Sequence, residues 1–174
     1  DRTNPPPKGC ILFVGSSSIR LWRTLAQDYP DLPVVNRGFG GSQLADSWYY
    51  ADRIIFPYRP KQVIIYAGTN DLNDKKKPEI VFGDFVALVK RIRKDAPDAR
   101  IGFISAAPTH ARWGIIEQFK EFNSLVKAYC QRHNVDYIDV YPLMLGPDGK
   151  PKNDIFVKDG LHLNANGINI DVIY

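Results

Sequence analysis

The sequence contains few of the residues on which whole classes of protein depend. Only two cysteines occur among its 174 residues, Cys10 and Cys130, so a disulfide-rich scaffold is excluded. Neither cysteine has a metal-ligating neighbour at a useful spacing, and we expect both to be buried as small apolar residues. Whether they pair in a disulfide is not decided by the sequence. The longest apolar runs fall far short of the roughly 18 residues that span a bilayer, so no membrane segment is predicted.

The chain also lacks a strong excess of charge of one sign. Its net charge is +4, and its 44% hydrophobic and 24% charged residues are typical of globular proteins, which excludes a disordered or collagen-like chain. Basic residues cluster at 75–77 and 90–94, but the second cluster alternates with Val89 and Ile92, as the exposed side of an amphipathic helix does. We therefore predict no nucleic-acid partner.

The length fits one domain covering residues 1–174, since domains average roughly 150 residues. The chain starts at Asp1 rather than at a methionine, and residues 1–8 form a Pro-rich segment. A processed N-terminus of this kind is compatible with export to the periplasm or the exterior, and the sequence leaves the localisation open.

Short runs rich in β-branched residues alternate with helical patterns along the chain. The runs cover residues 10–14, 34–36, 62–66, 100–105 and 135–139 and are too short for buried helices. Pro78 suits the first turn of one helix, and Asn164 can cap a last helix that runs toward Tyr174. This alternation predicts a three-layer α/β fold with a five-stranded parallel sheet. Apolar residues at helical spacing are Val81, Phe85, Leu88, Val89 and Ile92, and Phe119, Phe122, Val126 and Tyr129.

Polar, glycine-rich turns follow the first three predicted strands, at residues 15–18, 38–42 and 68–71. Because ligands of such sheets bind outside the carboxyl ends of the strands, we expect the three turns to converge on one rim. The glycine-rich turns do not match the spacing of known phosphate-binding motifs. The turn after Gly15 lacks the lysine that a P-loop requires. In the second turn, Gln43 occupies the position of the third glycine of a dinucleotide-binding fingerprint. We predict no organic cofactor and no metal.

A hydroxyl nucleophile needs a histidine base, and the chain has three histidines. His133 ends a helical pattern and suits a surface helix end. His110 follows the fourth predicted strand without an acid close in sequence. His162 has an acid, Asp159, three residues before it, and this pair follows the last predicted strand. That spacing lets the carboxylate reach the imidazole, so His162 is the candidate base.

Four ordered segments between Ile11 and Gly167 resemble the sequence blocks of the SGNH or GDSL-type serine esterases and acylhydrolases. In chain order they are 13–19 (FVGSSSI), 36–42 (NRGFGGS), 68–71 (GTND) and 159–162 (DGLH). The four segments occur in the family's order and at similar intervals.

The resemblance implies a flavodoxin-like α/β/α sandwich and a serine hydrolase that needs no metal or cofactor. It assigns the nucleophile to Ser17, the base to His162 and the acid to Asp159. The backbone N–H of Gly41 and the side chain of Asn70 are implied as donors to the oxyanion, together with the backbone N–H of Ser17. The expected partner is a small-molecule ester.

The nucleophile segment departs from the family pattern at one position. Ser16 stands where the family commonly has aspartate, which removes a negative charge and leaves three consecutive serines as candidates. Ser17 is preferred because the family's nucleophile lies two residues after the glycine. We expect Ser16, which can bond to the backbone, to alter hydrogen bonding under the turn without abolishing activity.

The substrate is less well defined by the sequence. No obvious lid insertion is present, which favours small acyl groups, including those of acetylated carbohydrates, over long-chain lipids. The tryptophans Trp22, Trp48 and Trp113 are expected to pack in the core or at the rim, although Trp113, with Arg112 and His110, is placed to shape an acyl or alcohol pocket. For Arg37 an ion pair with a surface carboxylate is expected in preference to binding of an acidic substrate group. A catalytically silent binding module and an acyltransferase stay open as alternatives, as does the oligomeric state.

Overall fold

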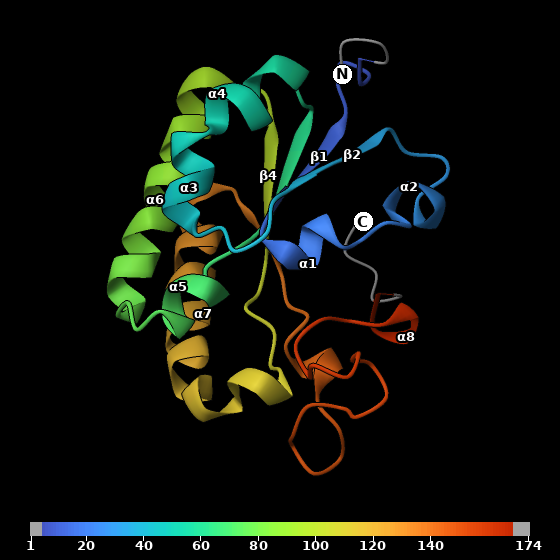
Figure 1. Ribbon diagram of the computed structural model, residues 1–174. Coiled ribbons are helices and arrows are strands. Elements are labelled where there is room, and N and C mark those ends of the chain that lie inside the picture. The colour runs from blue at the N-terminus through green and yellow to red at the C-terminus, as the bar shows by residue number, and fades with distance from the viewer. Residues whose placement is uncertain (1–4, 169–174) are drawn as a thin grey trace.

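A computed structural model describes residues 5–168, which form a parallel five-stranded sheet between two layers of helices (Figure 1). The strands lie in the order β2-β1-β3-β4-β5, and every neighbouring pair is parallel. The chain order therefore reverses at β1, as in flavodoxin-like folds, and the predicted α/β/α sandwich is confirmed. The strands are β1 (Ile11–Gly15), β2 (Val34–Gly38), β3 (Gln62–Tyr66), β4 (Arg100–Ile104) and β5 (Asp136–Ile138).

The five predicted strands are all present, with small shifts at their ends. Strand β2 continues to Gly38, beyond the predicted end, because Gly38 still pairs with Gly15 of β1. Strand β5 is shorter than predicted and covers only Asp136–Ile138. The carboxyl ends of β1, β2 and β3 lie at one edge of the sheet, as expected for parallel strands.

Alternate residues of the strands build two separate cores, one on each face of the sheet. In β1, Leu12 and Val14 belong to one core, and Ile11 and Phe13 belong to the other. This alternation follows from the two-residue period of a strand and explains why the buried strands read as continuous apolar runs.

The two helical layers differ in size (Figure 1). The long helices α6 and α7 cover one face together with α3 and α4, whereas the short helices α1, α2 and α8 lie on the other. Coil segments after β5 complete the second layer. The helices are α1 (Ser17–Arg20), α2 (Leu25–Asp28), α3 (Leu44–Tyr49), α4 (Ala51–Ile54), α5 (Thr69–Asn73), α6 (Pro78–Asp95), α7 (Ile116–His133) and α8 (Ala165–Ile168), with 3-10 helices η1 (Phe56–Tyr58), η2 (His110–Ile115) and η3 (Pro142–Met144).

The helix ends follow the sequence signals. Pro78 is the first residue of α6, where its missing N–H costs nothing. The side chain of Asn164 accepts hydrogen bonds from the backbone N–H groups of Asn166 (2.9 Å) and Gly167 (3.3 Å), so it caps α8 as predicted. The predicted continuation of this helix beyond Ile168 lies outside the described residues, as does part of the Pro-rich segment 1–8.

Both cysteines are buried free thiols, as expected for small apolar residues. Burial raises the pKa of the Cys130 thiol to about 12. Within residues 5–168, no cluster of side chains suits a metal ion, and no helix has the length and apolar character needed to cross a bilayer.

Candidate active site

The turn between β1 and α1 places Ser17 at the carboxyl edge of the sheet. Gly15 has a φ of 147°, and a Cβ at this position would lie 2.0 Å from the carbonyl oxygen of Tyr66 in β3. Only glycine fits there. The buried Ser16 donates its backbone N–H to the same oxygen (3.3 Å), but its side chain makes no capping hydrogen bond to α1. Ser17 is the first residue of α1, and its side chain is half-buried.

Ser17, His162 and Asp159 form a chain of hydrogen bonds. Ser17 Oγ lies 2.9 Å from His162 Nε2, and His162 Nδ1 lies 2.6 Å from Asp159 Oδ2. With a proton on Nδ1, the imidazole donates to the carboxylate and leaves Nε2 to accept from the serine hydroxyl. The three residues predicted as nucleophile, base and acid are thus brought together in the order that a serine hydrolase requires.

The loop that carries Asp159 holds the carboxylate in an orientation fixed by three donors. Oδ1 accepts the backbone N–H groups of Leu161 (2.8 Å) and His162 (2.9 Å), while Oδ2 faces the imidazole. The hydrogen bond from the His162 side chain, followed by the two backbone bonds, lowers the pKa of Asp159 to about 2. The carboxylate is therefore ionised throughout the neutral range.

The loop after β2 is tied to the nucleophile turn. Phe39 donates its backbone N–H to the carbonyl of Gly15 (2.9 Å), and Ser42 Oγ donates to the same carbonyl (3.1 Å). Within this loop Gly41 has a φ of 73°. In the part of the chain that the structure describes, the backbone N–H groups of Gly41 and Ser17 donate to no protein acceptor.

Asn70 joins the third turn to the second. Its Nδ2 donates to the carbonyl of Ser42 (2.9 Å), which uses one of the two amide hydrogens. Its Oδ1 accepts a hydrogen bond from Arg112 Nη2 (2.7 Å). The sequence placed Arg112 near the pocket but gave no indication of this contact, because the two residues are 42 positions apart and lie in different loops.

The residue after Asn70 anchors the same turn. Asp71 is fully buried, and its carboxylate accepts from the backbone N–H of Leu44 and from Lys76 Nζ, each at 3.3 Å. Burial raises the pKa of Asp71, and the charge of Lys76 opposes this shift. The hydrogen bond from Leu44 joins the start of α5 to α3, and the ion pair with Lys76 holds the carboxylate in place beside Asn70.

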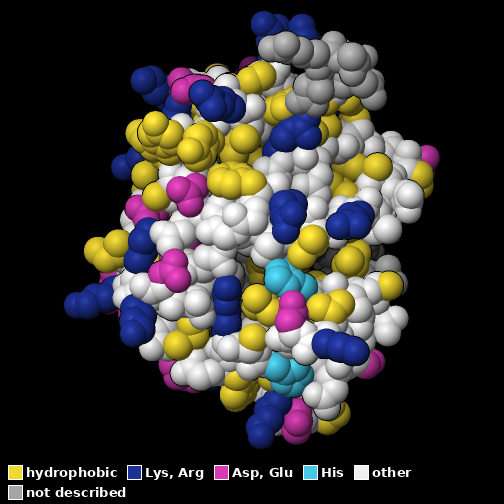
Figure 2. Space-filling view, viewed as in Figure 1, with side chains coloured by type: hydrophobic (Ala, Val, Ile, Leu, Met, Phe, Trp, Pro, Cys, Tyr) yellow, Lys and Arg dark blue, Asp and Glu magenta, His cyan; other side chains and the backbone are white. Residues whose placement is uncertain are grey.

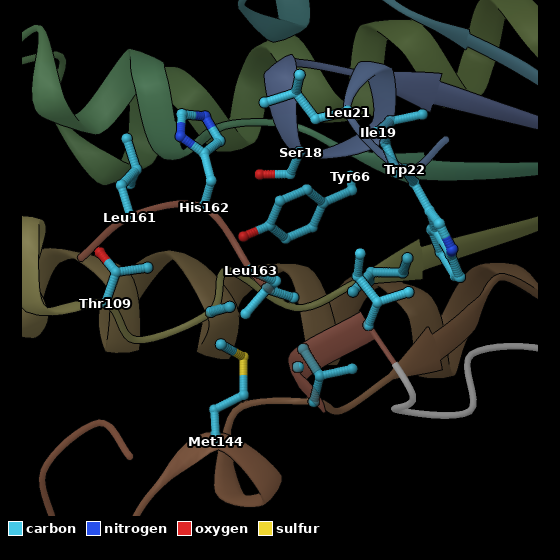
Figure 3. Close-up of a pocket in the computed structure, with 15 residues that line it drawn as sticks. Ser18, Ile19, Leu21, Trp22, Tyr66, Thr109, Met144, Leu161, His162 and Leu163 are labelled. Carbon is cyan, nitrogen blue, oxygen red and sulfur yellow. The ribbon is translucent and has the colours of Figure 1, made fainter. Parts of the chain in front are cut away.

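Two cavities are lined by candidate site residues, and they differ in volume and in the polarity of their walls. A cavity of about 10 Å³ is bounded by Ser17 and Asn70. A second cavity, of about 90 Å³, adjoins His162 and has mainly apolar walls, with the Tyr66 ring between its lining residues (Figure 3). The remaining walls of the small cavity are Ser16, Ser18, Tyr66, Thr69, Ala107, Thr109, Arg112, Phe119 and Leu161.

An open groove of about 860 Å³ runs beside Gly41 and shares no lining residue with these two cavities. The rings of Phe39 and Tyr50 meet edge to face in its wall, with centroids 5.9 Å apart. Polar side chains also line it, including Asn36 and Asp46. Figure 2 shows hydrophobic side chains gathered on this face over α3 and α4, where Trp48, Tyr49 and Tyr50 are exposed. On the same face, histidine and acidic side chains come to the surface together below α1.

The small cavity beside Ser17 is not lined by His133, His110, Trp113 or Arg37. His133 stacks on Tyr129 at the end of α7, as a surface helix-end residue, and His110 is exposed at the start of η2. Trp113 is half-buried and lines none of the three cavities described above. Arg37 donates from Nε to the hydroxyl of Tyr58 (2.6 Å) and stacks over its ring, contacts that the sequence did not predict.

Comparisons with known proteins agree with the fold and the motifs. Solved structures of the same fold include a Streptococcus pneumonia protein named for platelet activating factor, with 20% identity over 92% of this chain and 78% of that chain and a TM-score of 0.82. A GDSL-like lipase from Bacteroides thetaiotaomicron matches with 20% identity over 96% and 87% of the two chains and a TM-score of 0.78. An acetyl xylan esterase matches with 17% identity over 90% and 92% and a TM-score of 0.75. At these identities the likenesses establish the fold.

Among curated proteins, none matches the sequence. The model of the GDSL-like lipase/acylhydrolase family, however, matches residues 13–169, which is most of the chain and includes all four motif segments. The chain therefore belongs to the GDSL-like lipase/acylhydrolase family.

Proposed function

We propose that the protein is a serine esterase that removes small acyl groups from ester substrates through an acyl-enzyme on Ser17. The observation that carries this proposal is the hydrogen-bonded chain from Ser17 Oγ through His162 to Asp159, at 2.9 and 2.6 Å. These distances lie within the range expected between a nucleophile, its base and the acid that orients the base. Membership of an acylhydrolase family supports the same class of reaction.

In the first step, His162 Nε2 takes the proton of the Ser17 hydroxyl as Oγ attacks the ester carbonyl carbon. Asp159, which stays ionised, stabilises the imidazolium that forms. The tetrahedral intermediate then collapses, and His162 gives the proton to the leaving alcohol. A water molecule attacks the acyl-enzyme in the second step by the same sequence, which releases the acid and restores Ser17.

The carbonyl oxygen gains negative charge in both steps and needs donors that are already in place. The backbone N–H groups of Ser17 and Gly41 have no acceptor among the described residues, and Asn70 keeps one amide hydrogen that Ser42 does not use. We assign these three donors to the oxyanion. The hydrogen bonds that tie the loop of Gly41 to Gly15 preorganise the donors, so they do not have to reorganise during the reaction.

The small cavity supports a short acyl group. Its volume of about 10 Å³ is close to the space that a single water molecule requires. It is bounded by Ser17 and Asn70, and Leu161 and Thr69 limit it on other sides. An acetyl methyl fits such a space, whereas a longer chain would need room beyond this cavity.

The open groove supports a sugar as the leaving alcohol. Sugar rings present apolar C–H faces and polar hydroxyls, and the groove offers both aromatic rings, in Phe39 and Tyr50, and polar side chains, in Asn36 and Asp46. It adjoins Gly41, one of the assigned oxyanion donors. One protein of the same fold is an acetyl xylan esterase, which is consistent with an acetylated carbohydrate as substrate.

The proposal is tested by comparing the wild type with Ser17→Ala on p-nitrophenyl acetate, butyrate and octanoate and on acetylated xylooligosaccharides. We expect activity that depends on Ser17 and decreases from acetate to octanoate. Equal rates for the two proteins would contradict the esterase and favour a silent binding module. Transfer of the acetyl group to an added sugar in place of water would instead identify an acyltransferase that uses the same three residues.

A further inference from the structure

Arg112 contacts the side chain of Asn70, one of the assigned oxyanion donors. Its Nη2 donates to Asn70 Oδ1 at 2.7 Å, and its side chain lines the same small cavity as Ser17. The residue lies in η2, after β4, and is only partly exposed. The contact is a charge-assisted hydrogen bond, which is shorter and stronger than one between neutral groups.

The guanidinium group of Arg112 forms no direct ion pair with the residues that the structure describes. Among residues 5–168, no carboxylate oxygen lies within 4.0 Å of Arg112, and the charge of Asp74 acts on it only from a greater distance. Burial lowers the pKa of Arg112, but an arginine remains charged under all ordinary conditions. Its positive charge is therefore available to the place where negative charge develops during the proposed reaction.

The two contacts of Asn70 specify which way its amide points. Arginine has donors only, so the amide oxygen must face Arg112, and the carbonyl of Ser42 has acceptor capacity only, so the NH₂ group must face Ser42. If the amide rotated by 180°, donors would meet donors and acceptors would meet acceptors. The second amide hydrogen is not used by Ser42, and Asn70 lines the same small cavity as Ser17.

We propose that Arg112 is a positioning residue that orients and polarises the Asn70 amide as a donor to the oxyanion. This inference rests on the proposed function, since it assigns a role within the same site. Loss of Arg112 leaves Asn70 with one anchoring contact instead of two and removes a cation from the oxyanion side. Because the oxyanion exists only in the transition state and the intermediate, the effect falls on kcat and not on KM.

The test is a double-mutant cycle between Arg112 and Asn70, with p-nitrophenyl acetate as substrate. We expect Arg112→Met to lower kcat by at least about tenfold with little change in KM, and Arg112→Lys to retain part of the lost rate. In the Asn70→Ala background, Arg112→Met should have little further effect, because the group that it positions is absent. Arg93→Met is the matched control, since Arg93 also donates to backbone carbonyls of the fold, at Ala99 and Asn134, but lies away from the site.

The outcomes separate this inference from the proposed function. A wild type without Ser17-dependent turnover would defeat the proposed function. A wild type with such turnover, combined with an unchanged kcat in Arg112→Met or with equal losses in the two backgrounds, would overturn only the role of Arg112. Thermal unfolding of each variant shows whether it is folded; if Arg112→Met is not, the same cycle with Arg112→Lys decides, with coupling to Asn70 expected and additivity contradicting the inference.

Discussion

Ser17 and His162 are 145 positions apart in the chain, yet Ser17 Oγ and His162 Nε2 lie 2.9 Å apart. The sheet positions Ser17, because β1 ends at the turn that carries this residue. The loop after β5 positions His162. Its Val157 donates to the carbonyl of His162 (2.9 Å), and Asn164 donates to that of Ile155 (3.0 Å), so the histidine is held in a closed loop.

Replacing Asn70 by alanine removes an assigned oxyanion donor. We expect Asn70→Ala to lower kcat by about 10² to 10³-fold while KM changes little, which is the usual cost of losing one such donor. Steady-state kinetics with p-nitrophenyl acetate measure both constants. A loss that fell on KM alone would indicate that Asn70 binds the substrate without stabilising the oxyanion.

Replacing Asp159 by asparagine removes the acceptor for His162 Nδ1–H but preserves the shape of the side chain. Because the imidazole then loses the partner that fixes its tautomer, we expect kcat to fall by about 10³ to 10⁴-fold. Asparagine can still accept the backbone N–H groups of Leu161 and His162, so the loop should remain intact. An active Asp159→Asn variant would contradict the assigned role of Asp159.

The Asp159 carboxylate makes the stability of the folded protein depend on pH in the acidic range. Its pKa of about 2 lies below the ordinary value of 3.8, so its ionised form stabilises the fold above about pH 4. This contribution is lost as the pH falls from about 4 through 2. The side chain is 47% exposed, and solvent screening keeps the contribution small. Thermal unfolding of the wild type and Asp159→Asn between pH 2 and 6 should show the two proteins converge in acid.

Two glycines near the site should respond differently to alanine, although both have a positive φ. At Gly15 the added Cβ would lie 2.0 Å from the backbone oxygen of Tyr66, so Gly15→Ala should destabilise the fold by more than about 3 kcal/mol or prevent folding. At Gly41 no atom lies within 4 Å of an added Cβ, and only backbone strain of about 1 to 2 kcal/mol is expected. Urea unfolding of the two variants measures the difference, and equal losses would count against the described turn.

Enlarging the small cavity should broaden the range of acyl chains. Leu161 forms one of its walls, and Leu161→Ala opens space beside Ser17 and Asn70 without touching either. We expect the ratio of kcat/KM for butyrate to that for acetate to rise by about tenfold or more, since each buried methylene contributes about 0.8 kcal/mol. Leu143→Ala, at an exposed position outside the cavities, is the control. An unchanged ratio would show that acyl groups bind elsewhere.

Much of the fold follows from patterns in the sequence. Local signals predict the strands and the helix ends, because each depends on residues a few positions apart. Examples are the short β-branched runs, Pro78 at the start of α6 and Asn164 as the cap of α8. The rim residues Ser17, Gly41 and Asn70 follow from a resemblance in four ordered segments, and the contact between Asp159 and His162 follows from a spacing of three. The parallel sheet then explains why these distant segments meet.

Other features depend on contacts that no local pattern indicates. The hydrogen bond from Arg112 to Asn70 joins two loops, and its existence depends on where η2 crosses the rim. The stacking of Arg37 on Tyr58 likewise joins β2 to η1. Cavity sizes depend on how side chains from several elements pack, so neither the small cavity beside Ser17 nor the aromatic groove beside Gly41 was predicted.

Activation of Ser17 by His162 is measured most directly by covalent labelling of the native protein with a fluorophosphonate, followed by peptide mass spectrometry. A serine that is activated by His162 attacks the phosphorus and expels fluoride, which leaves a stable adduct. We predict one adduct per chain, on Ser17, and none on Ser17→Ala or on urea-unfolded protein. Labelling of Ser16 or Ser18 instead, or no labelling of folded protein, would contradict the account.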